Sequence, residues 1–385
     1  MNINNPHRSG RYVQQPTGYR AFIPSALPPL PPVTMDDGLV ALLSDADRAL
    51  GRLDGSTDTL PDPDMFVMMY VRKEAVLSSQ IEGTQASLSD LLEAEAETSR
   101  PDAPKDVDEV VNYIAAMNYG LERLRELPVS GRLIKEIHAH LLDGVRGEHL
   151  SPGELRTTQN WIGPPGCSLN KAAFVPPPPH EVPEHLGALE HFLHDTKPMP
   201  ILIKVGLAHA QFETIHPFLD GNGRIGRLLV TFLLCETNVL KRPLLYLSHF
   251  FKRNREDYYK HLQATRDRGD WEGWLKFFLT GVATVSLEAT ATARKIVSLK
   301  QEHTDLIRSK LGKGAGRAIV LLEKMYQQPF VSINAVSRIA GVQFPSANAL
   351  VENFVNLGIL EEISGRARNR VFRYRPYVDV LTQDS

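Results

Sequence analysis

The residues of this chain most able to do chemistry lie together in one segment, HPFLDGNGRIGR, at residues 216–227. The imidazole of His216 can act as a general base, and the carboxylate of Asp220 can hold a divalent cation. Arg224 and Arg227 are about one helical turn apart and can neutralise anionic groups. Together these residue types indicate a site that handles a phosphorylated substrate.

The segment is predicted to be a loop between two helices. Pro217 disfavours the helical conformation of the residue before it, so a preceding helix should end at His216. Apolar residues then recur at helical spacing, so a second helix should begin near Asn222 or Gly223. The free N–H groups and positive dipole end of such a helix form a binding site for phosphate.

Two other phosphate-binding motifs are excluded. Gly221, Gly223 and Gly226 spell GxGxxG, but the dinucleotide-binding fingerprint needs a preceding β-strand and an acidic residue about 20 positions later. Residues 201–215 instead have apolar residues at helical spacing, and no acidic residue lies around Tyr246. A P-loop is also excluded, because GNGRIGR lacks the Lys-Ser/Thr ending.

The segment resembles the signature of the Fic family, HPFx[D/E]GNGRxxR, at every fixed position. The resemblance implies transfer of a nucleoside monophosphate, usually AMP from ATP, onto a hydroxyl group of a target protein. It also implies a mainly α, multi-helix Fic fold with a small β-hairpin flap. Many proteins of this family carry a C-terminal winged helix-turn-helix as well.

The resemblance further implies a role for each position of the segment. His216 would take the proton from a Tyr, Thr or Ser hydroxyl, and Asp220 would hold Mg²⁺, or Mn²⁺ in its place. Backbone N–H groups would hold the α-phosphate, while Arg224 and Arg227 would neutralise the β- and γ-phosphates. The set expected to bind ATP is Gly221, Asn222, Gly223, Arg224, Ile225, Gly226, Arg227 and, further along the chain, Tyr259.

A second informative stretch ends a helix predicted to start after Pro63 and to continue towards Ile81. Ser78 and Glu82 fit the pattern [S/T]xxxE[G/N], and their i, i+4 spacing puts them on one helix face. Alone, this pattern is common on exposed helices. With the resemblance it implies an inhibitory helix, in which Glu82 pairs with an arginine of the phosphate site and takes the place of the ATP γ-phosphate.

Residues 156–179 are rich in Pro and Gly and contain two short strand-like runs, around 160–162 and 172–175. The runs are typical of a hairpin, and a plain surface loop is the alternative. In the Fic family the corresponding segment is a flap that clamps a target peptide by strand addition. The residues expected to form this flap are Asn160, Trp161, Ile162, Ala173, Phe174 and Val175.

Aromatic residues follow the motif in two predicted helices, Ser248–Arg268 and Trp271 to about Leu311. Such residues often belong to a hydrophobic core, but ATP also needs a site for its adenine ring. Tyr259 is the preferred residue for that site, with Tyr258 behind it.

Residues 312–385 are predicted to form a separate winged helix-turn-helix, in which Ser332 caps the second helix. The would-be recognition helix contains neither Lys nor Arg, which favours a protein contact over DNA binding. Arginines do occur in the predicted wing, at Arg366, Arg368 and Arg370. The predicted elements are helices over 317–327, 332–340 and 345–357, and a hairpin of 359–363 with 371–374.

The rest of the chain is predicted to be an N-terminal arm and helices. Residues 1 to about 35 are rich in Pro and polar side chains, and should be extended. His138, in a helix capped by Ser130, is interpreted as a structural or surface histidine. Further helices are expected over 35–53, 87–97, 107–127 and up to Leu142. The predicted domains are residues 1–104, 105–311 and 312–385.

The chain has 385 residues, a formal net charge of −2 and two cysteines. This charge does not favour nucleic acid or a membrane surface as a partner, and two distant cysteines do not favour a disulfide framework. No secretory signal and no apolar run of membrane-spanning length occur, so a cytoplasmic location is expected. The expected partner is a target protein, and self-modification and a homodimer are further expectations.

Two functional alternatives stay open. In one, the chain is a DNA-binding regulator in which the Fic site is secondary. In the other, the same site uses another nucleotide, or removes AMP from target proteins.

Overall fold

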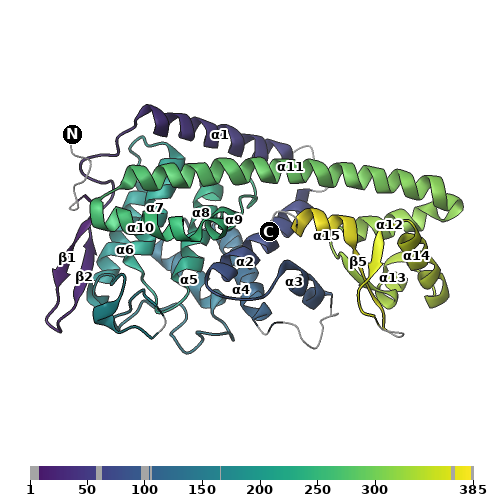
Figure 1. Ribbon diagram of the computed structural model, residues 1–385, viewed down its shortest axis with the longest axis horizontal. Helices are drawn as coiled ribbons and strands as arrows, with labels where there is room; N and C mark the ends of the chain where they lie inside the picture. The colour runs from purple at the N-terminus through teal and green to yellow at the C-terminus, as the bar shows by residue number, and fades with distance from the viewer. Residues whose placement is uncertain are drawn as a thin grey trace.

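The structure is a computed structural model that describes residues 8–57, 63–96, 104, 106–164, 166–365 and 369–382. It is mostly helical, as the sequence predicts (Figure 1). The elements up to the motif are β1 (Gly10–Gln14), β2 (Arg20–Pro24), α1 (Asp37–Thr57), α2 (Pro63–Ile81), α3 (Leu88–Glu95), α4 (Val107–Arg123), α5 (Gly131–Leu141), η2 (Leu169–Lys171), η3 (Pro179–Glu181), α6 (Val182–His194) and α7 (Ile201–Ile215).

The remaining elements begin with the motif helix, α8. They are α8 (Asn222–Glu236), α9 (Ser248–Arg253), α10 (Arg255–Arg268), α11 (Trp271–Leu311), η4 (Gly312–Gly314), α12 (Ala315–Met325), β3 (Phe330–Ser332), α13 (Ile333–Ala340), α14 (Phe344–Asn356), β4 (Leu360–Glu362), β5 (Val371–Tyr374) and α15 (Arg375–Thr382).

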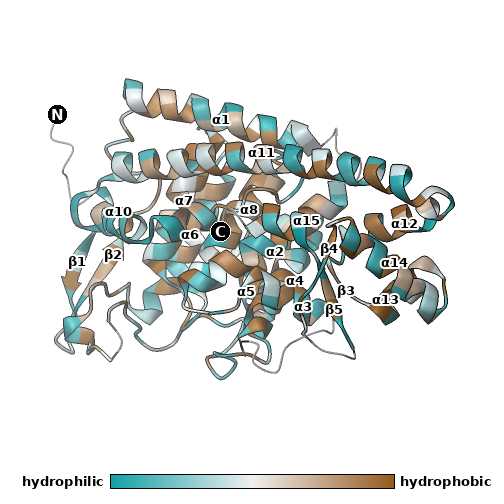
Figure 2. Ribbon diagram, turned by 45° about the vertical axis from the view of Figure 1, so that its right-hand side comes forward, coloured by the Kyte–Doolittle hydropathy of each residue, from teal (hydrophilic) through white to brown (hydrophobic). Residues whose placement is uncertain are grey.

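Helices α7 and α8 lie at the centre of the protein. Every residue from Val205 to Ile215 is buried, and so is every residue from Arg224 to Leu234. A helix that is buried on all sides belongs to a core, and Figure 2 shows hydrophobic residues concentrated on these two helices while α10 is largely hydrophilic. The motif therefore lies between the two most deeply buried helices.

Helix α11 extends along much of the molecule beside α1 (Figure 1). Its first part packs on α7, where the indole Nε1 of Trp274 donates to the carbonyl oxygen of Gly206 at 2.7 Å. Its last part contacts the C-terminal unit, where Nδ1 of His303 lies 2.6 Å from the hydroxyl of Tyr374. This helix connects the motif core to residues 312–382.

The N-terminal arm differs from the extended segment predicted for it. Residues Gly10–Gln14 and Arg20–Pro24 form an antiparallel hairpin, β1–β2. Phe22 is fully buried, and its N–H donates to the carbonyl oxygen of Val175 at 2.9 Å. The hairpin therefore packs against the predicted flap, and this contact covers the ring of Phe22.

The helix predicted over Ser248–Arg268 is two helices, and the prediction is wrong at Asn254. This residue has φ −116° and ψ 40°, outside the helical region. Its side-chain Nδ2 donates to the carbonyl oxygen of Phe250 at 2.9 Å, the same oxygen that accepts from its backbone N–H at 3.0 Å. The break divides the segment into α9 and α10.

The C-terminal unit contains the predicted helices and the predicted hairpin of β4 and β5. The side chain of Ser332 accepts from the N–H of Ala335, which confirms it as the cap of α13. Two elements were not predicted: strand β3, which gives a sheet of order β3-β5-β4, and helix α15.

Helix α14, the predicted recognition helix, carries no basic side chain. Arg370 donates to Oδ1 of Asn348 on α14 at 2.8 Å, whereas Arg366 and Arg368 lie outside the described residues. Phe344, at the start of α14, is 53% exposed, so the surface of that helix is apolar at this end. The winged-helix interpretation, its partner and the domain boundaries stay predictions.

Within the part of the chain that the structure covers, no helix combines the length and the apolar character that a bilayer crossing requires.

The packing of α4 on the motif helix generates a first prediction. A Cβ atom added at Gly120 would lie 2.4 Å from the ring of Phe232 on α8, so Gly120→Ala should reduce the free energy of unfolding by about 1–3 kcal/mol. The control is Gly187→Ala on α6, where nothing lies within 4 Å and no loss is expected. Denaturant unfolding measures both, and equal stability of the two variants would contradict the packing described.

Candidate nucleotide site

The motif loop joins the end of α7 to the start of α8, as predicted. His216 ends α7 with φ 50° and ψ 60°, a left-handed conformation, and its carbonyl oxygen accepts from Nε of Arg156 at 2.9 Å. Gly221, also left-handed at φ 77°, precedes Asn222, the first residue of α8. The chain therefore reverses sharply, which leaves the imidazole and the start of α8 in the same region.

Asn222 and Phe218 hold the loop in shape. The side chain of Asn222 accepts from the N–H of Phe218 and donates to its carbonyl oxygen, both at 2.8 Å. Asn160, predicted as a flap residue, also donates to that oxygen, at 2.7 Å. Both amide side chains are therefore used within the protein, and the backbone of α8 is left to meet a phosphate.

His138 on α5 supports the same loop. It is buried, so it is a structural histidine and not a surface one. Its ring stacks on Phe218 with 3.8 Å between centroids. The N–H of Gly153 donates to Nδ1, so Nε2 carries the proton and donates to the carbonyl oxygen of Asp220 at 3.0 Å. Burial lowers the pKa of His138 to about 4, which keeps the ring neutral.

Arg227 lies against the end of α2. It donates through Nε to the hydroxyl of Ser78 at 2.8 Å and through Nη2 to Oε1 of Glu82 at 2.8 Å. Burial opposes the ionisation of Glu82, but the charge of Arg227 outweighs it, and the pKa of the carboxyl lies below its ordinary value. The structure thus brings together the two predicted inhibitory residues and one arginine of the phosphate site.

Gly223 explains how closely Glu82 approaches α8. A Cβ atom at this position would lie 2.2 Å from Oε1 of Glu82. The carboxylate therefore lies over the first turn of α8, where unpaired N–H groups and the helix dipole favour an anion. Glu82 occupies a place suited to a phosphate.

Arg224 lies on another face of α8 and does not line the pocket. Its Nη1 is 3.3 Å from Oε2 of Glu109, and its Nη2 is 3.8 Å from Oδ2 of Asp220. Nε and Nη2 are buried and make no hydrogen bond to any described residue. Arg224 therefore has unpaired N–H donors, one of which, Nη2, lies near the Asp220 carboxylate.

Asp220 is the candidate metal ligand, and the residues around it fit a magnesium ion bound mainly by substrate. One carboxylate oxygen accepts from the N–H of Gly221 at 2.7 Å, and the side chain is partly exposed. The described residues contain no group of three or more His, Cys, Asp or Glu side chains placed to share an ion. Mg²⁺ commonly uses one or two carboxylates together with phosphates and water, so a single aspartate is sufficient.

His216 is half-buried beside two arginines. Burial and the charges of Arg266 and Arg156 lower its pKa to about 3. The imidazole is therefore neutral at ordinary pH and able to accept a proton. Its Nδ1 is buried and has no hydrogen-bond partner in the described part of the chain.

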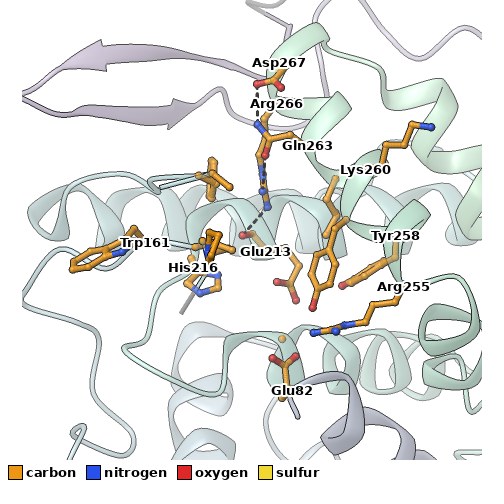
Figure 3. A pocket seen from close by; sticks show the side chains of 18 of the residues that line it. Glu82, Trp161, Glu213, His216, Arg255, Tyr258, Lys260, Gln263, Arg266 and Asp267 are labelled. Atoms are coloured by element: carbon orange, nitrogen blue, oxygen red, sulfur yellow. Dashed lines mark hydrogen bonds between the residues drawn. The ribbon is translucent and has the colours of Figure 1, made fainter. Parts of the chain in front are cut away.

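A cavity of about 880 Å³ opens between α8, α10 and the flap (Figure 3). His216, Arg227 and Glu82 line it together. The other predicted residues that line it are Trp161, Ile162, Ala173, Phe174, Gly223 and Tyr259. The predicted residues outside its lining are Ser78, Asn160, Val175, Asp220, Gly221, Asn222, Arg224, Ile225 and Gly226.

Tyr258 and Tyr259 both line the cavity from α10. Nδ1 of His209 donates to the carbonyl oxygen of Gly226 at 2.8 Å, so its Nε2 accepts from the hydroxyl of Tyr258 at 2.9 Å. This bond directs the Tyr258 hydroxyl into the core and fixes its ring as a wall. Tyr259 is 40% exposed, and the guanidinium of Arg255 lies 5.6 Å from its ring centroid.

The flap has less strand character than the predicted hairpin. Ile162 and Phe174 form one bridge, with N–H to O distances of 2.8 and 3.1 Å, and no longer ladder is described. Pro164 and the prolines after Val175 cannot donate, which limits pairing on both sides. Phe174 is buried beneath the guanidinium of Arg266, whereas Trp161 is 42% exposed.

Glu213 was missed by the sequence analysis. It lies three residues before His216 on α7 and lines the same cavity. Burial raises the pKa of this carboxyl to about 7, and Glu82 raises it further, against the effect of Arg227. The i, i+3 spacing from His216 was the one available signal in the sequence.

Two regions of the chain match known families. Residues 128–234 match the Fic/DOC family, and residues 40–122 match the Fic/DOC family N-terminal region. A probable protein adenylyltransferase from Aquifex aeolicus (strain VF5) is 30% identical over 208 residues, 52% of this chain and 57% of that protein. Protein adenylyltransferase Fic from Drosophila grimshawi is 28% identical over 173 residues, 44% of this chain and 32% of that protein. The chain thus matches less than two thirds of either relative.

Solved structures share the fold. A Fic family protein from Desulfovibrio desulfuricans G20 aligns with a TM-score of 0.57 and 21% identity, over 89% of this chain and 97% of that one. Fic-1 from C. elegans aligns with a TM-score of 0.51 and 22% identity, over 66% of this chain and 73% of that one.

The buried carboxyl of Glu213 generates a pH prediction. In the unfolded chain this group ionises near its ordinary pKa of about 4.3, but in the folded protein only near 7, so its ionisation increasingly favours unfolding as pH rises. Glu213→Gln removes that cost. The free energy of unfolding of the variant, relative to the parent, should therefore rise by about 1–3 kcal/mol between pH 5 and pH 8.

Denaturant unfolding at the two pH values measures this difference. The control is Glu184→Gln, which replaces an exposed carboxylate on α6 and should show no such trend. A Glu213→Gln difference that is constant, or that falls with pH, would contradict the burial of a protonated carboxyl.

Proposed function

Because the chain belongs to the Fic/DOC family, we propose that it is a protein adenylyltransferase that transfers AMP from ATP to a Tyr, Thr or Ser hydroxyl. The observation that supports the proposal most directly is one cavity lined by His216, Arg227 and the first turn of α8. A neutral base, a buried cation and free backbone donors are the groups that a nucleotidyl transfer requires.

ATP would bind with its phosphates over the start of α8. The N–H groups of Asn222 and Gly223 would hold the α-phosphate, since the N–H of Gly221 donates to Asp220 and the Asn222 side chain is used by Phe218. Arg227 would neutralise the terminal phosphates once Glu82 has moved. Asp220 would hold Mg²⁺, which would supply positive charge to the phosphates.

In the transfer, the oxygen of the target hydroxyl forms a bond to the α-phosphorus, and the bond from that phosphorus to the β-phosphate oxygen breaks. Pyrophosphate leaves with the electrons of that bond. The imidazole of His216 accepts the hydroxyl proton. Arg156 fixes the backbone of His216 in its left-handed conformation and so positions the ring.

The target would dock on the flap. Ile162 uses its backbone in the bridge to Phe174, so the backbone of Trp161 and Gly163 and the exposed indole of Trp161 are the parts of the flap offered to an extended peptide. A hydroxyl of the chain itself is a second candidate target.

Glu82 would act as an inhibitor, because it takes the arginine that the γ-phosphate needs. The helix that carries it is held firmly: Glu74 of α2 accepts from the N–H and hydroxyl of Ser248, and Lys252 donates to Gln80 at 2.7 Å. ATP must therefore displace the carboxylate from a fixed helix.

Replacement of the base tests the proposal directly. His216→Ala should reduce the transfer of labelled AMP to protein by about 10²- to 10⁴-fold, because the proton of the hydroxyl has no acceptor, while ATP binding remains. The control is His191→Ala, an exposed histidine on α6. Undiminished transfer by His216→Ala would show that this imidazole is not the base.

Removal of the carboxylate tests the inhibition. A charge-assisted hydrogen bond contributes about 1.5–3 kcal/mol, so Glu82→Gly should raise the rate of AMP transfer at low ATP by about 10- to 100-fold. Glu95→Gly is a suitable control, since Glu95 pairs with Arg72 near the surface and not with the phosphate site. Equal rates for Glu82→Gly and the parent would exclude inhibition by this contact.

A further inference from the structure

Glu213 is a buried carboxyl group to which the proposed reaction gives no role. It is 6% exposed, and its Oε1 forms no hydrogen bond within the described chain. Figure 3 shows its side chain projecting into the cavity between His216 and Tyr258, on the side of Glu82. A buried polar atom without a partner, on a carboxyl group that lines a cavity, indicates a place where a ligand atom is expected.

The carboxyl group also lies close to the phosphate site. A Cβ atom at Gly226 would be 2.3 Å from its Oε1, so the group packs directly on the backbone of α8 one residue before Arg227. A ligand whose phosphates lie over the first turn of α8 would therefore come near Glu213.

The charged and titratable groups around Glu213 come from each neighbouring element. They are Arg227 on α8, Glu82 after α2, His216 after α7, and Tyr258, Tyr259 and Arg266 on α10. Burial and Glu82 favour the protonated carboxyl, and the two arginines oppose them. A bound triphosphate would bring further negative charge beside Arg227, which again favours the protonated form.

We propose that Glu213 contacts the nucleotide as a neutral carboxylic acid, donating a hydrogen bond to an oxygen atom of the ribose or the phosphates. An ionised Glu213 would repel the same ligand, because both would be negative in a site from which water is excluded. The inference rests on the proposed function and deepens it: the site takes an anionic nucleotide together with a proton on Glu213.

ATP binding measured against pH tests the inference. The parent protein is the full chain with Glu82→Gly and His216→Ala, so that neither the inhibitory carboxylate nor the imidazole contributes, and the comparison protein adds Glu213→Gln. Glutamine keeps a donor at the same position but cannot ionise. Between pH 6.5 and pH 8.5 the Kd of the parent for ATP should rise about tenfold more than that of the Gln variant, while the two should agree within about threefold at pH 6.5.

Calorimetry in two buffers of different ionisation enthalpy gives a second measurement, made on the parent and on the Gln variant. The parent should take up protons on binding ATP at pH 8, up to about one per nucleotide. The ionisation of ATP itself is common to both proteins and cancels in their difference.

Each other outcome has a clear meaning. Identical pH profiles, tighter parent binding at higher pH, loss of binding by the Gln variant at pH 6.5, or no proton uptake would overturn the role of Glu213 alone. Failure of both proteins to bind ATP at any pH would overturn the proposed function and this inference with it.

Discussion

The buried guanidinium of Arg227 is the constraint around which the rest of the site is arranged. It is 3% exposed, and a charge removed from water in this way is costly unless an opposite charge and hydrogen bonds accompany it. Ser78 and Glu82 supply both, and they come from α2, far away in the sequence. Any anion that takes the place of Glu82 must satisfy the same guanidinium, so the proposed inhibition and the proposed binding of ATP would depend on a single charge.

Neutral buried groups fix the shape around that charge. His209 joins α7, the backbone of α8 and Tyr258, whereas His138 joins α5 to the loop at Asp220. Burial lowers the pKa of both imidazoles to about 4, so they stay uncharged and keep one tautomer. The loop is therefore preorganised before any ligand arrives, which is the condition for stabilising a developing charge at low cost.

Local patterns were enough to predict much of the fold and the motif. Pro217 and the helical spacing on both sides of it predicted the end of α7 and the start of α8. Capping residues such as Ser332 predicted other helix starts. The features that were missed depend on contacts between distant segments. Strand β2 packs on Val175, and the flap forms a single bridge, between Ile162 and Phe174, in the described residues. The break at Asn254 is instead local, a backbone conformation outside the helical region that periodicity does not reveal. Glu213 was missed because only the folded structure shows that its carboxyl faces a cavity.

The central claim is that the carboxylate of Glu82 and the terminal phosphate of ATP compete for Arg227. Calorimetric binding of ATP and of AMP, by the parent chain and by Glu82→Gly, tests it most directly, because AMP has no phosphate that extends to the guanidinium. The account predicts that Glu82→Gly binds ATP at least about tenfold more tightly, the equivalent of 1.4 kcal/mol, and leaves the affinity for AMP unchanged. An equal gain for both nucleotides, or no gain for ATP, would contradict it.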